Sequence, residues 1–368
     1  MYPLVVAHHR LSMTRPSALP FTVPPTSLCI LRLSAIGDVC HAVAVVQAIQ
    51  QQWPDTRISW VVGKVEASLL AGLPGVELVV YDKKSGWRGW WALRRHFAGR
   101  RFDALLMMQV AARASWLSLA IPARIRLGFE RKRAREGQWL VTNAKALSAA
   151  GPHVIDGFAA FVRTLGLAWN GPRWQMPLDS ATRHWAALQH DGRPLLLLCP
   201  AASKAERNWL PERYAALLTH AAQQGMSLMI CGGPSLMERQ LASAITANCL
   251  FEVDNRVGDT SLKQLLALMA EATVVVAPDT GPLHMAATVG TPALGLYAHS
   301  NPARTGPLAP HAEVVSVYEQ VLAEQSGGDA AAHRWGKRNR GDDLMARISI
   351  EQVTSALDRI LTKVARSR

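Results

Sequence analysis

Short apolar runs alternate with helical patterns along almost the whole of this 368-residue chain. Between these runs, apolar residues recur at the spacing of a helix that buries one face. Strands that alternate with helices form parallel sheets with right-handed crossovers and helices on both faces. The sequence therefore predicts an α/β fold of two Rossmann-like units, with strands near 28–33, 57–63, 76–80, 102–108 and 124–128, and near 194–199, 226–231, 249–253, 272–277, 292–297 and 313–317.

The length of the chain suits two such units, because a single hydrophobic core rarely grows beyond about 250–300 residues. A stretch rich in Gly and Pro over 168–193 has the composition of a linker. A polar, Gly-rich and basic stretch over 325–343 is expected to form a mobile loop. The predicted order is an unstructured N-terminal extension, an N-terminal domain, a C-terminal domain and a terminal helix that packs back on the domains, at residues 1–26, 27–175, 176–345 and 346–368.

Two predicted strand-to-helix turns carry polar residues. They are Ser34-Ala35-Ile36-Gly37-Asp38 in the first half and Asp279-Thr280-Gly281-Pro282 in the second. Both lie just past the carboxyl end of a strand, where open parallel sheets bind their ligands. Such a turn directs free backbone N–H groups and the positive end of a helix toward one point, which suits phosphate. Two facing turns of this kind predict that a nucleotide-linked substrate lies between two domains.

The first turn carries neither the G-x-G-x-x-G fingerprint of dinucleotide-binding proteins nor the lysine of a P-loop. Hydride transfer and phosphoryl transfer through those motifs are therefore disfavoured. Asp38 remains as a carboxylate at the mouth of the predicted cleft. A glycosyl transfer with inversion needs such a group as the general base for the acceptor hydroxyl. Alternatively, Asp38 only caps the helix that follows.

Several polar residues of the second half are candidates for binding a departing diphosphate. The sequence has no D-x-D pair at a strand end to hold a divalent cation, so basic side chains and helix N-termini would have to stabilise that charge. Lys204 and Arg207 are suitably placed, although either is otherwise a surface charge. His284 either bonds the diphosphate or is a satisfied polar residue. Gly233 and Glu238 belong to a further strand-to-helix turn that suits phosphate or ribose, although Glu238 is equally a solvated helix acid.

Positive charge is concentrated in the first half of the chain. Residues 1–180 carry 22 Lys and Arg against 10 Asp and Glu, whereas residues 181–368 carry 18 against 17. Such a face attracts phosphorylated molecules, anionic lipid headgroups or nucleic acid, or is simply a solvated surface. The stretch Trp87-Arg88-Gly89-Trp90-Trp91 suits a headgroup interface, unless its tryptophans belong to the core. No nucleic-acid-binding signature accompanies the charge, so we expect no nucleic-acid partner. The five cysteines lack metal-ligand spacing and are expected to be buried, reduced thiols.

Three motifs between residues 28 and 320 carry a family resemblance. They are Leu31-Arg32-Leu33-Ser34-Ala35-Ile36-Gly37-Asp38-Val39 with His41, Trp209-Leu210-Pro211-Glu212-Arg213-Tyr214, and Pro278-Asp279-Thr280-Gly281-Pro282-Leu283-His284 with Ala286-Ala287. Together they resemble the bacterial heptosyltransferases of glycosyltransferase family 9, which build the inner core of lipopolysaccharide from ADP-heptose. That family usually has a lysine two residues before a Trp-Pro pair, where this chain has Arg207 and an inserted Leu210. The 325–343 stretch lies outside the family pattern.

The resemblance implies a GT-B fold of two Rossmann-like domains that face each other across a cleft, with the acceptor on the first and the donor on the second. It implies inverting, metal-independent chemistry without a cofactor, with Asp38 as the general base and Arg207 as a catalytic cation. The remaining donor-binding residues are then Lys204, Gly233, Glu238, Asp279, Thr280, Gly281 and His284. The acceptor-binding residues are Ser34, Gly37, His41 and Arg126. The acceptor is an acidic glycolipid, Kdo-lipid A or heptosylated core, reached by a cytoplasmic enzyme peripheral to the inner membrane. The alternatives are a transferase for another nucleotide sugar and a non-enzymatic protein that binds one.

Overall fold

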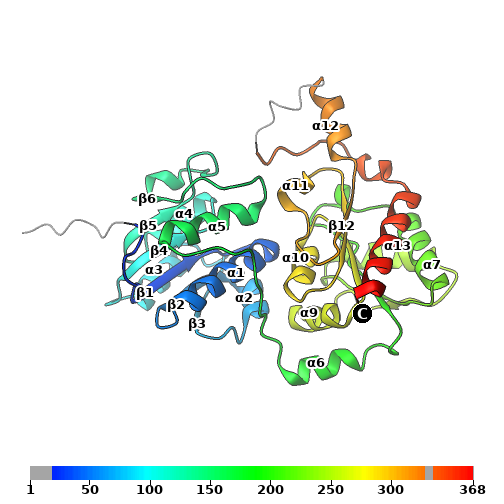
Figure 1. Ribbon diagram of the computed structural model, residues 1–368, viewed down its shortest axis with the longest axis horizontal. Helices are drawn as coiled ribbons and strands as arrows, with labels where there is room; N and C mark the ends of the chain where they lie inside the picture. The colour runs from blue at the N-terminus through cyan, green and yellow to red at the C-terminus, as the bar shows by residue number, and fades with distance from the viewer. Residues whose placement is uncertain (1–18, 328–334, 368) are drawn as a thin grey trace, which may run out of the picture.

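The computed structural model describes residues 19–327 and 335–367, which form two lobes (Figure 1). Each lobe is built on one six-stranded sheet in which every strand pair is parallel. Numbered within its own domain, each sheet has the strand order 3-2-1-4-5-6. The predicted α/β architecture of two Rossmann-like units is therefore confirmed. In both sheets the strand order reverses at the centre, which is where such folds bind ligands.

The N-terminal sheet has the order β3-β2-β1-β4-β5-β6. At its centre, Ile30 of β1 lies opposite Trp60 on one side and Leu106 on the other. Nearly all of β1 is buried, because helices cover both faces of the sheet. The strands are β1 (Ser27–Leu31), β2 (Arg57–Gly63), β3 (Val76–Tyr81), β4 (Phe102–Met107), β5 (Ala123–Gly128) and β6 (Ala144–Lys145).

The C-terminal sheet has the order β12-β11-β10-β7-β8-β9. Its central strand β10 is entirely buried, and Val276 lies opposite Leu294 and Leu198. The continuous apolar runs of β7 and β10 are those of strands covered on both faces. The strands are β7 (Leu195–Leu198), β8 (Ser227–Ile230), β9 (Asp254–Asn255), β10 (Val274–Pro278), β11 (Ala293–Tyr297) and β12 (Glu313–Ser316).

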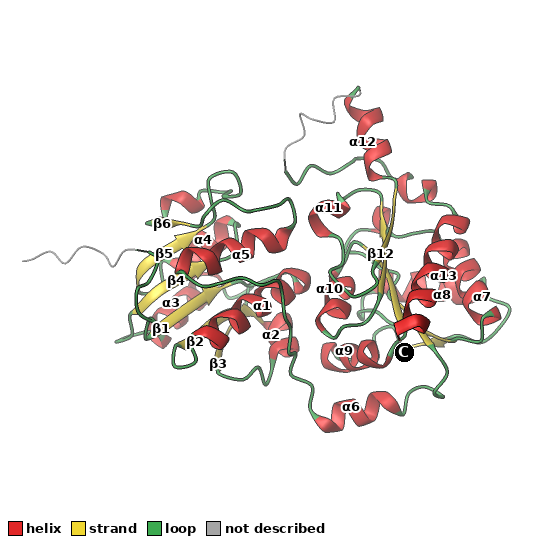
Figure 2. Cartoon of the chain, in the orientation of Figure 1, coloured by secondary structure: helices red, strands yellow, loops and turns green. Residues whose placement is uncertain are grey.

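Helices connect the strands and cover the sheets (Figure 2). In the first domain they are α1 (Ile36–Gln52), α2 (Lys64–Leu70), α3 (Gly86–His96), α4 (Ala112–Ser118) and α5 (Val154–Leu165). The remainder are α6 (Ser180–Ala187), α7 (Pro211–Gln223), α8 (Leu236–Ala247), α9 (Leu262–Glu271), α10 (Gly281–Thr288), α11 (Pro302–Thr305), α12 (Tyr318–Ser326) and α13 (Ile350–Ser367). Within the described ranges, no helix combines the length and apolar character that crossing a membrane requires.

The two domains touch where α1 of the first packs against α10 of the second (Figure 1). Two glycines allow this close approach. A Cβ atom on Gly281 would lie 3.2 Å from Cβ of Ile36, and one on Gly37 would collide with the imidazole ring of His284. The turns that follow β1 and β10 are therefore held against each other in this structure.

Two segments that were predicted to be irregular are ordered. The expectation for residues 1–18 falls outside the described part of the chain, but residues 19–26 pack on the first domain. The Phe21 amide donates to Leu165 O at 3.0 Å, and its ring lies 6.0 Å from that of Trp53. The expected linker contains α6, which is capped by Asp179 and packs against α9. Flanking Gly and Pro residues obscured this short helix in the sequence.

Two further expectations need correction. The strand expected near 249–253 is wrong, because Leu250 is fully exposed there and the edge strand is the polar pair of β9. The expected mobile loop is partly ordered. Its start belongs to α12, and Asn339 is buried and donates to Ala298 O at 3.0 Å and Tyr318 O at 2.9 Å. Residues 328–334 of that expectation lie outside the described chain.

The terminal helix α13 packs on the C-terminal domain, against β12 and α7, through the face that carries Val353, Leu357 and Ile360. The Trp209-to-Tyr214 motif holds the chain just before this helix. The buried Trp209 donates its Nε1–H to Ile348 O at 3.1 Å, and Arg213 donates to Ala346 O at 2.6 Å. These two motif residues therefore fix the end of the chain.

Candidate active site at the domain contact

Asp38 lies just past the carboxyl end of β1, as the third residue of α1. Its carboxylate forms an ion pair with the buried guanidinium of Arg32. The N-cap of α1 is Ala35, so the alternative that Asp38 only caps the helix is wrong. The Asp38 side chain keeps 32% of its surface exposed, so the carboxylate is held in place and still accessible.

Arg32 is the residue that orients Asp38, and its own position is fixed from three directions. Besides the ion pair, it donates to Met108 O at 2.5 Å and its guanidinium lies 5.6 Å from the centre of the Phe158 ring. Burial lowers the pKa of Arg32, and the neighbouring Asp38 opposes that shift. Sequence reasoning gave Arg32 no role of its own. Its signal was a charged residue at the end of an otherwise apolar strand, Leu28 to Leu33.

The Asp279-Thr280-Gly281 turn follows β10 directly, and Gly281 is the first residue of α10. The N-cap, Thr280, makes no side-chain hydrogen bond to the helix. Pro282 has no N–H and the Leu283 amide donates to Thr280 O at 3.2 Å, so the Gly281 amide is the N–H of this turn that remains for an anion, with the positive helix end behind it. Gly281 lies against Ile36 of the first turn, so the two turns that the sequence predicted to face each other do so.

Three histidines fill the contact between the domains. The ring centroid of His41 lies 4.8 Å from that of His284 and 5.6 Å from that of His153. Burial lowers the pKa of all three, and it lowers that of His41 well below the ordinary value of 6.5. His41 and His284 were assigned to acceptor and donor, and the structure brings them into one cluster. Sequence reasoning missed His153, whose Nε2 lies 3.0 Å from Gly306 O of the second domain.

The cation candidates Lys204 and Arg207 lie on the loop after β7, beside a one-turn helix at Ala205–Arg207. Lys204 is 60% exposed on its side chain and pairs with Glu206 at 3.2 Å. Arg207 is half-buried and has no hydrogen bond or ion pair through its side chain with any residue the structure describes. Lys204 therefore has a local partner already, whereas the guanidinium of Arg207 is uncommitted.

Glu238 bends back onto its own turn. Its carboxylate accepts hydrogen bonds from the Gly233 amide and from Ser235 Oγ, the latter at 3.1 Å. Ser235 in turn caps α8 by accepting from the Glu238 amide. In this structure the carboxylate therefore occupies the backbone donor that was expected to meet phosphate or ribose.

The guanidinium of Arg126 is engaged in hydrogen bonds within the N-terminal domain. Its guanidinium donates to Ser118 Oγ at 2.7 Å, Val141 O at 2.7 Å and Ile121 O at 3.1 Å. These partners all belong to the N-terminal domain, so Arg126 holds β5 to its neighbours. Ser34, in contrast, is half-buried at the turn beside Asp38.

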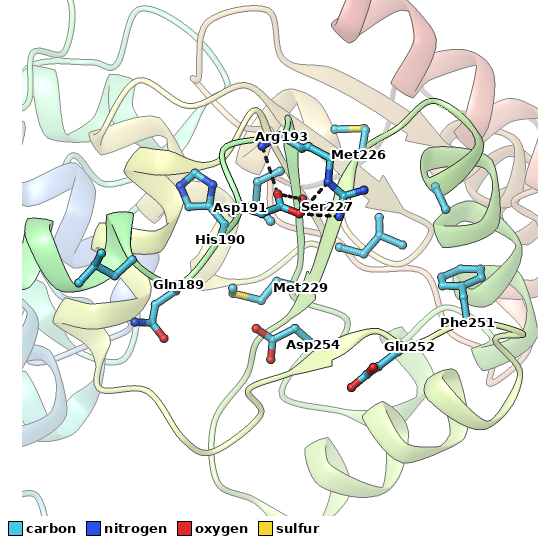
Figure 3. A pocket seen from close by; sticks show the side chains of 14 residues that line it. Gln189, His190, Asp191, Arg193, Met226, Ser227, Met229, Phe251, Glu252 and Asp254 are labelled. Carbon is cyan, nitrogen blue, oxygen red and sulfur yellow. Dashed lines mark hydrogen bonds and ion pairs between the residues drawn. The ribbon is translucent and has the colours of Figure 1, made fainter.

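A hollow of about 700 Å³ lies elsewhere, at the amino ends of β7 and β8 (Figure 3). Arg193 pairs there with Asp191, which also accepts from Ser227 Oγ at 2.6 Å. Ligands of open parallel sheets bind at the opposite, carboxyl edge. We therefore place the candidate site at the domain contact and not in this hollow.

Among the described residues, the thiols and carboxylates show no metal-ligand arrangement. Cys29, Cys40, Cys199 and Cys231 are buried and Cys249 partly so, and none forms a disulfide. Burial raises the pKa of Cys40 to about 12, so this thiol stays protonated. Across residues 19–327 and 335–367, no three His, Cys, Asp or Glu side chains are grouped so that they could hold a metal ion.

Two facing Rossmann-like domains, with a carboxylate at the switch point of one and a helix N-terminus at that of the other, have the GT-B architecture that many glycosyltransferases use. Comparison with known proteins agrees. Residues 90–333 match the family model described as "Glycosyltransferase family 9 (heptosyltransferase)". The chain therefore belongs to glycosyltransferase family 9 and is an enzyme of that class.

Individual relatives match 80% or more of the chain. It is 44% identical to lipopolysaccharide core heptosyltransferase OpsX of Haemophilus influenzae, over 92% of this chain and 98% of that protein. It is 22% identical to lipopolysaccharide heptosyltransferase 1 of Escherichia coli K12, over 80% of this chain and 98% of that protein. Its fold resembles that of a family 9 glycosyltransferase from Veillonella parvula, with a TM-score of 0.76, 20% identity, and coverage of 92% and 97%. It also resembles that of E. coli ADP-heptose heptosyltransferase II, with a TM-score of 0.71 and 19% identity, over 92% of this chain and 99% of that chain.

Proposed function

We propose that this protein transfers heptose from ADP-heptose to an acidic inner-core acceptor of lipopolysaccharide, with inversion and without a metal ion. The observation that carries the proposal is the Asp38–Arg32 pair facing the Gly281 end of α10 across the domain contact. The 44% identity to a lipopolysaccharide core heptosyltransferase supports the donor and acceptor classes.

In the proposed reaction Asp38 accepts the proton of the acceptor hydroxyl while that oxygen attacks the anomeric carbon. The bond from the anomeric carbon to the diphosphate oxygen breaks in the same step, and ADP leaves from the opposite face. Arg32 holds the carboxylate in its orientation through the ion pair. Charge that develops on the diphosphate is stabilised by the N-terminus of α10 and by Arg207.

Donor binding requires some movement around Glu238 and α10. The Glu238 carboxylate occupies the Gly233 amide in this structure, and Gly281 is packed against Ile36. We propose that the domains separate to admit substrates and close again for the reaction, and that Glu238 then bonds ribose hydroxyls. Donor and acceptor bind to different domains, so closure brings the reacting atoms together.

We also propose that the surface of α3 contacts the anionic headgroups of a membrane. Trp87 and Trp91 are 65% and 52% exposed, so the alternative that they belong to the core is wrong, whereas Trp90 is half-buried and packs against the core of the N-terminal domain. The same helix exposes Arg88, Arg94 and Arg95. Exposed indoles beside guanidiniums suit the boundary of an anionic lipid surface. The acceptor lipid would be presented at that surface, on the cytoplasmic side of the inner membrane.

Vesicle sedimentation tests this surface. Wild-type protein should pellet with vesicles that contain phosphatidylglycerol and remain in the supernatant with pure phosphatidylcholine. The double variant Trp87→Ser, Trp91→Ser should lose the binding. Trp139→Ser, which removes an indole that is 48% exposed outside this helix, is the matched control. Equal pelleting of the double variant and the control would contradict the assignment.

Calorimetry with ADP, UDP, GDP and CDP, each with EDTA or with Mg²⁺, tests the donor. Binding of ADP alone, unchanged by EDTA, supports an ADP-sugar donor without a metal. Preference for another nucleotide would retain the transferase and discard heptose. Loss of ADP binding in EDTA would overturn the metal-independent chemistry.

A further inference from the structure

Arg304 is a basic residue at the domain contact that the proposed mechanism has not yet used. It lies in α11, the helix that follows β11. β11 pairs with β10, and Asp279 is the first residue after β10. The short helix is well fixed, because Asn301 Oδ1 accepts from the Ala303 amide at 2.8 Å and Tyr297 Oη donates to Thr305 O at 2.7 Å. Arg304 therefore has a rigid base.

The charges that act on the Arg304 guanidinium come from both domains. Burial lowers its pKa, while the negative charges of Asp38 and Asp279 oppose that shift. Asp38 belongs to the N-terminal domain and Asp279 to the C-terminal domain, so carboxylates of both domains act on the Arg304 guanidinium. Its side chain forms no hydrogen bond or ion pair with any described residue, and its Nε is buried without a partner.

This lack of partners separates Arg304 from its basic neighbours. Arg32 is paired with Asp38, and Arg133 donates to Gly151 O at 2.6 Å and His153 O at 3.1 Å. The Arg304 side chain is half-buried, and a guanidinium that is partly removed from water without a counter-ion carries a desolvation cost. An anion that enters with the substrate would satisfy it, with two N–H groups donating to two oxygens of one phosphate.

Trp335 holds this guanidinium from one side. The centre of its ring lies 4.4 Å from Cζ of Arg304 and 4.6 Å from Cζ of Arg133 (residues of opposite domains). Its Nε1–H donates to Pro152 O of the N-terminal domain at 2.7 Å. Stacking uses the face of a guanidinium and leaves its in-plane N–H groups free to bind oxygen.

The chain after Trp335 is anchored to the C-terminal domain. The Asn339 amide donates to His299 O at 3.0 Å, and its side chain bonds two further backbone carbonyls. Trp335 is thus tied to one domain by its backbone and contacts the other by its indole. Its sequence neighbourhood lies outside the family pattern, so neither motif nor spacing pointed to it.

We propose that Arg304 binds the departing diphosphate and that Trp335 is the positioning residue that holds Arg304 in the site. This inference rests on the proposed function and adds a cation to it. Diphosphate is the anion that the position favours, because Asp279 begins the turn that is proposed to hold the same group. A carboxylate of an acidic acceptor sugar offers similar chemistry, and the test separates the two sources.

The test compares Arg304→Ala with the matched control Arg366→Ala, which removes an exposed arginine near the end of α13. Calorimetry with ADP and with adenosine isolates the phosphates. Arg304→Ala should weaken ADP binding by about 10- to 100-fold, because hydrogen bonds to charged groups have that magnitude, and leave adenosine binding unchanged. Unchanged ADP affinity with a raised KM for the acceptor would overturn the assignment in favour of the acceptor. Equal losses for ADP and adenosine would show a structural role and also overturn it.

Trp335 is tested by rescue. Trp335→Ala should lower kcat at least tenfold without a matching loss of thermal stability, while Trp335→Phe should recover most of kcat because it keeps an aromatic face for the guanidinium. Equal activity of the two variants would contradict the positioning role. If the wild type transfers heptose but Arg304→Ala binds ADP normally, this inference fails and the proposed function stands. If Arg304→Ala loses ADP binding but the wild type transfers no heptose, the proposed function fails and the assignment of Arg304 to the diphosphate stands.

Discussion

Replacing Arg32 by methionine tests how Asp38 is held, because it removes the charge and keeps a long unbranched side chain. The Arg32 side chain is 10% exposed and that of Asp38 is 32% exposed. Removing one partner of a buried ion pair costs about 3–5 kcal/mol, and the partial hydration of Asp38 places this pair near 3 kcal/mol. Since about 1 kcal/mol shifts the melting temperature of a domain of this size by 2–4 °C, the variant should melt about 6–12 °C lower.

The assay is thermal unfolding at neutral pH together with steady-state kinetics. Arg124→Met is the control, because Arg124 is 44% exposed and lies 3.9 Å from Asp103 in a weak surface pair. It should change stability by less than about 0.5 kcal/mol. The double variant of Arg32→Met with Asp38→Asn should be more stable than the sum of its single changes predicts, by about 1–3 kcal/mol. Additive losses, or an Arg32 variant that melts with the control, would refute the ion pair as the support of Asp38.

Four other outcomes can be measured. Asp38→Asn should lower kcat by about 10²–10⁴-fold while ADP affinity stays within about twofold, and normal turnover would exclude Asp38 as the base. Gly281→Val should weaken ADP binding in calorimetry, because the new side chain crowds the Gly281 N–H, and unchanged affinity would argue against the phosphate turn. Arg207→Ala should lose turnover more than melting temperature, whereas the opposite pattern would assign it a structural role. Burial depresses the pKa of His41 below 6.5, so its stabilising effect is complete above that pH and is lost as the pH falls. A His41→Gln variant should therefore lose less stability below pH 6.5 than the wild type. Parallel curves of unfolding free energy against pH for the two proteins would contradict this.

Much of the fold could be predicted because its central strands are continuous apolar runs bounded by turns. Val274 to Pro278 is buried throughout, and no other local structure accounts for such a run followed by Gly281 and Pro282. Edge elements gave weaker signals. β9 is formed by two polar residues, Asp254 and Asn255, whose pairing depends on a neighbouring strand and not on their own pattern.

The candidate site was predictable only where chemistry and local structure coincide. Asp38 and Gly281 lie at turns whose position follows from the strands before them. Arg304, Trp335 and His153 come from segments that meet only after both domains have folded, so no local pattern identifies them. Arg126 was predicted to bind the acceptor because it is a basic residue of the N-terminal sheet. Its guanidinium instead bonds Ser118, Ile121 and Val141 within that domain.

The most direct test is a transfer reaction with purified protein, ADP-heptose and Kdo-lipid A in EDTA, followed by mass spectrometry and NMR of the product. The proposed function predicts one added heptose per acceptor, an anomeric configuration opposite to that of the donor, and loss of the product in the Asp38→Asn variant. A product with the donor's configuration, or a product that the variant forms at the wild-type rate, would contradict a single displacement with Asp38 as the base.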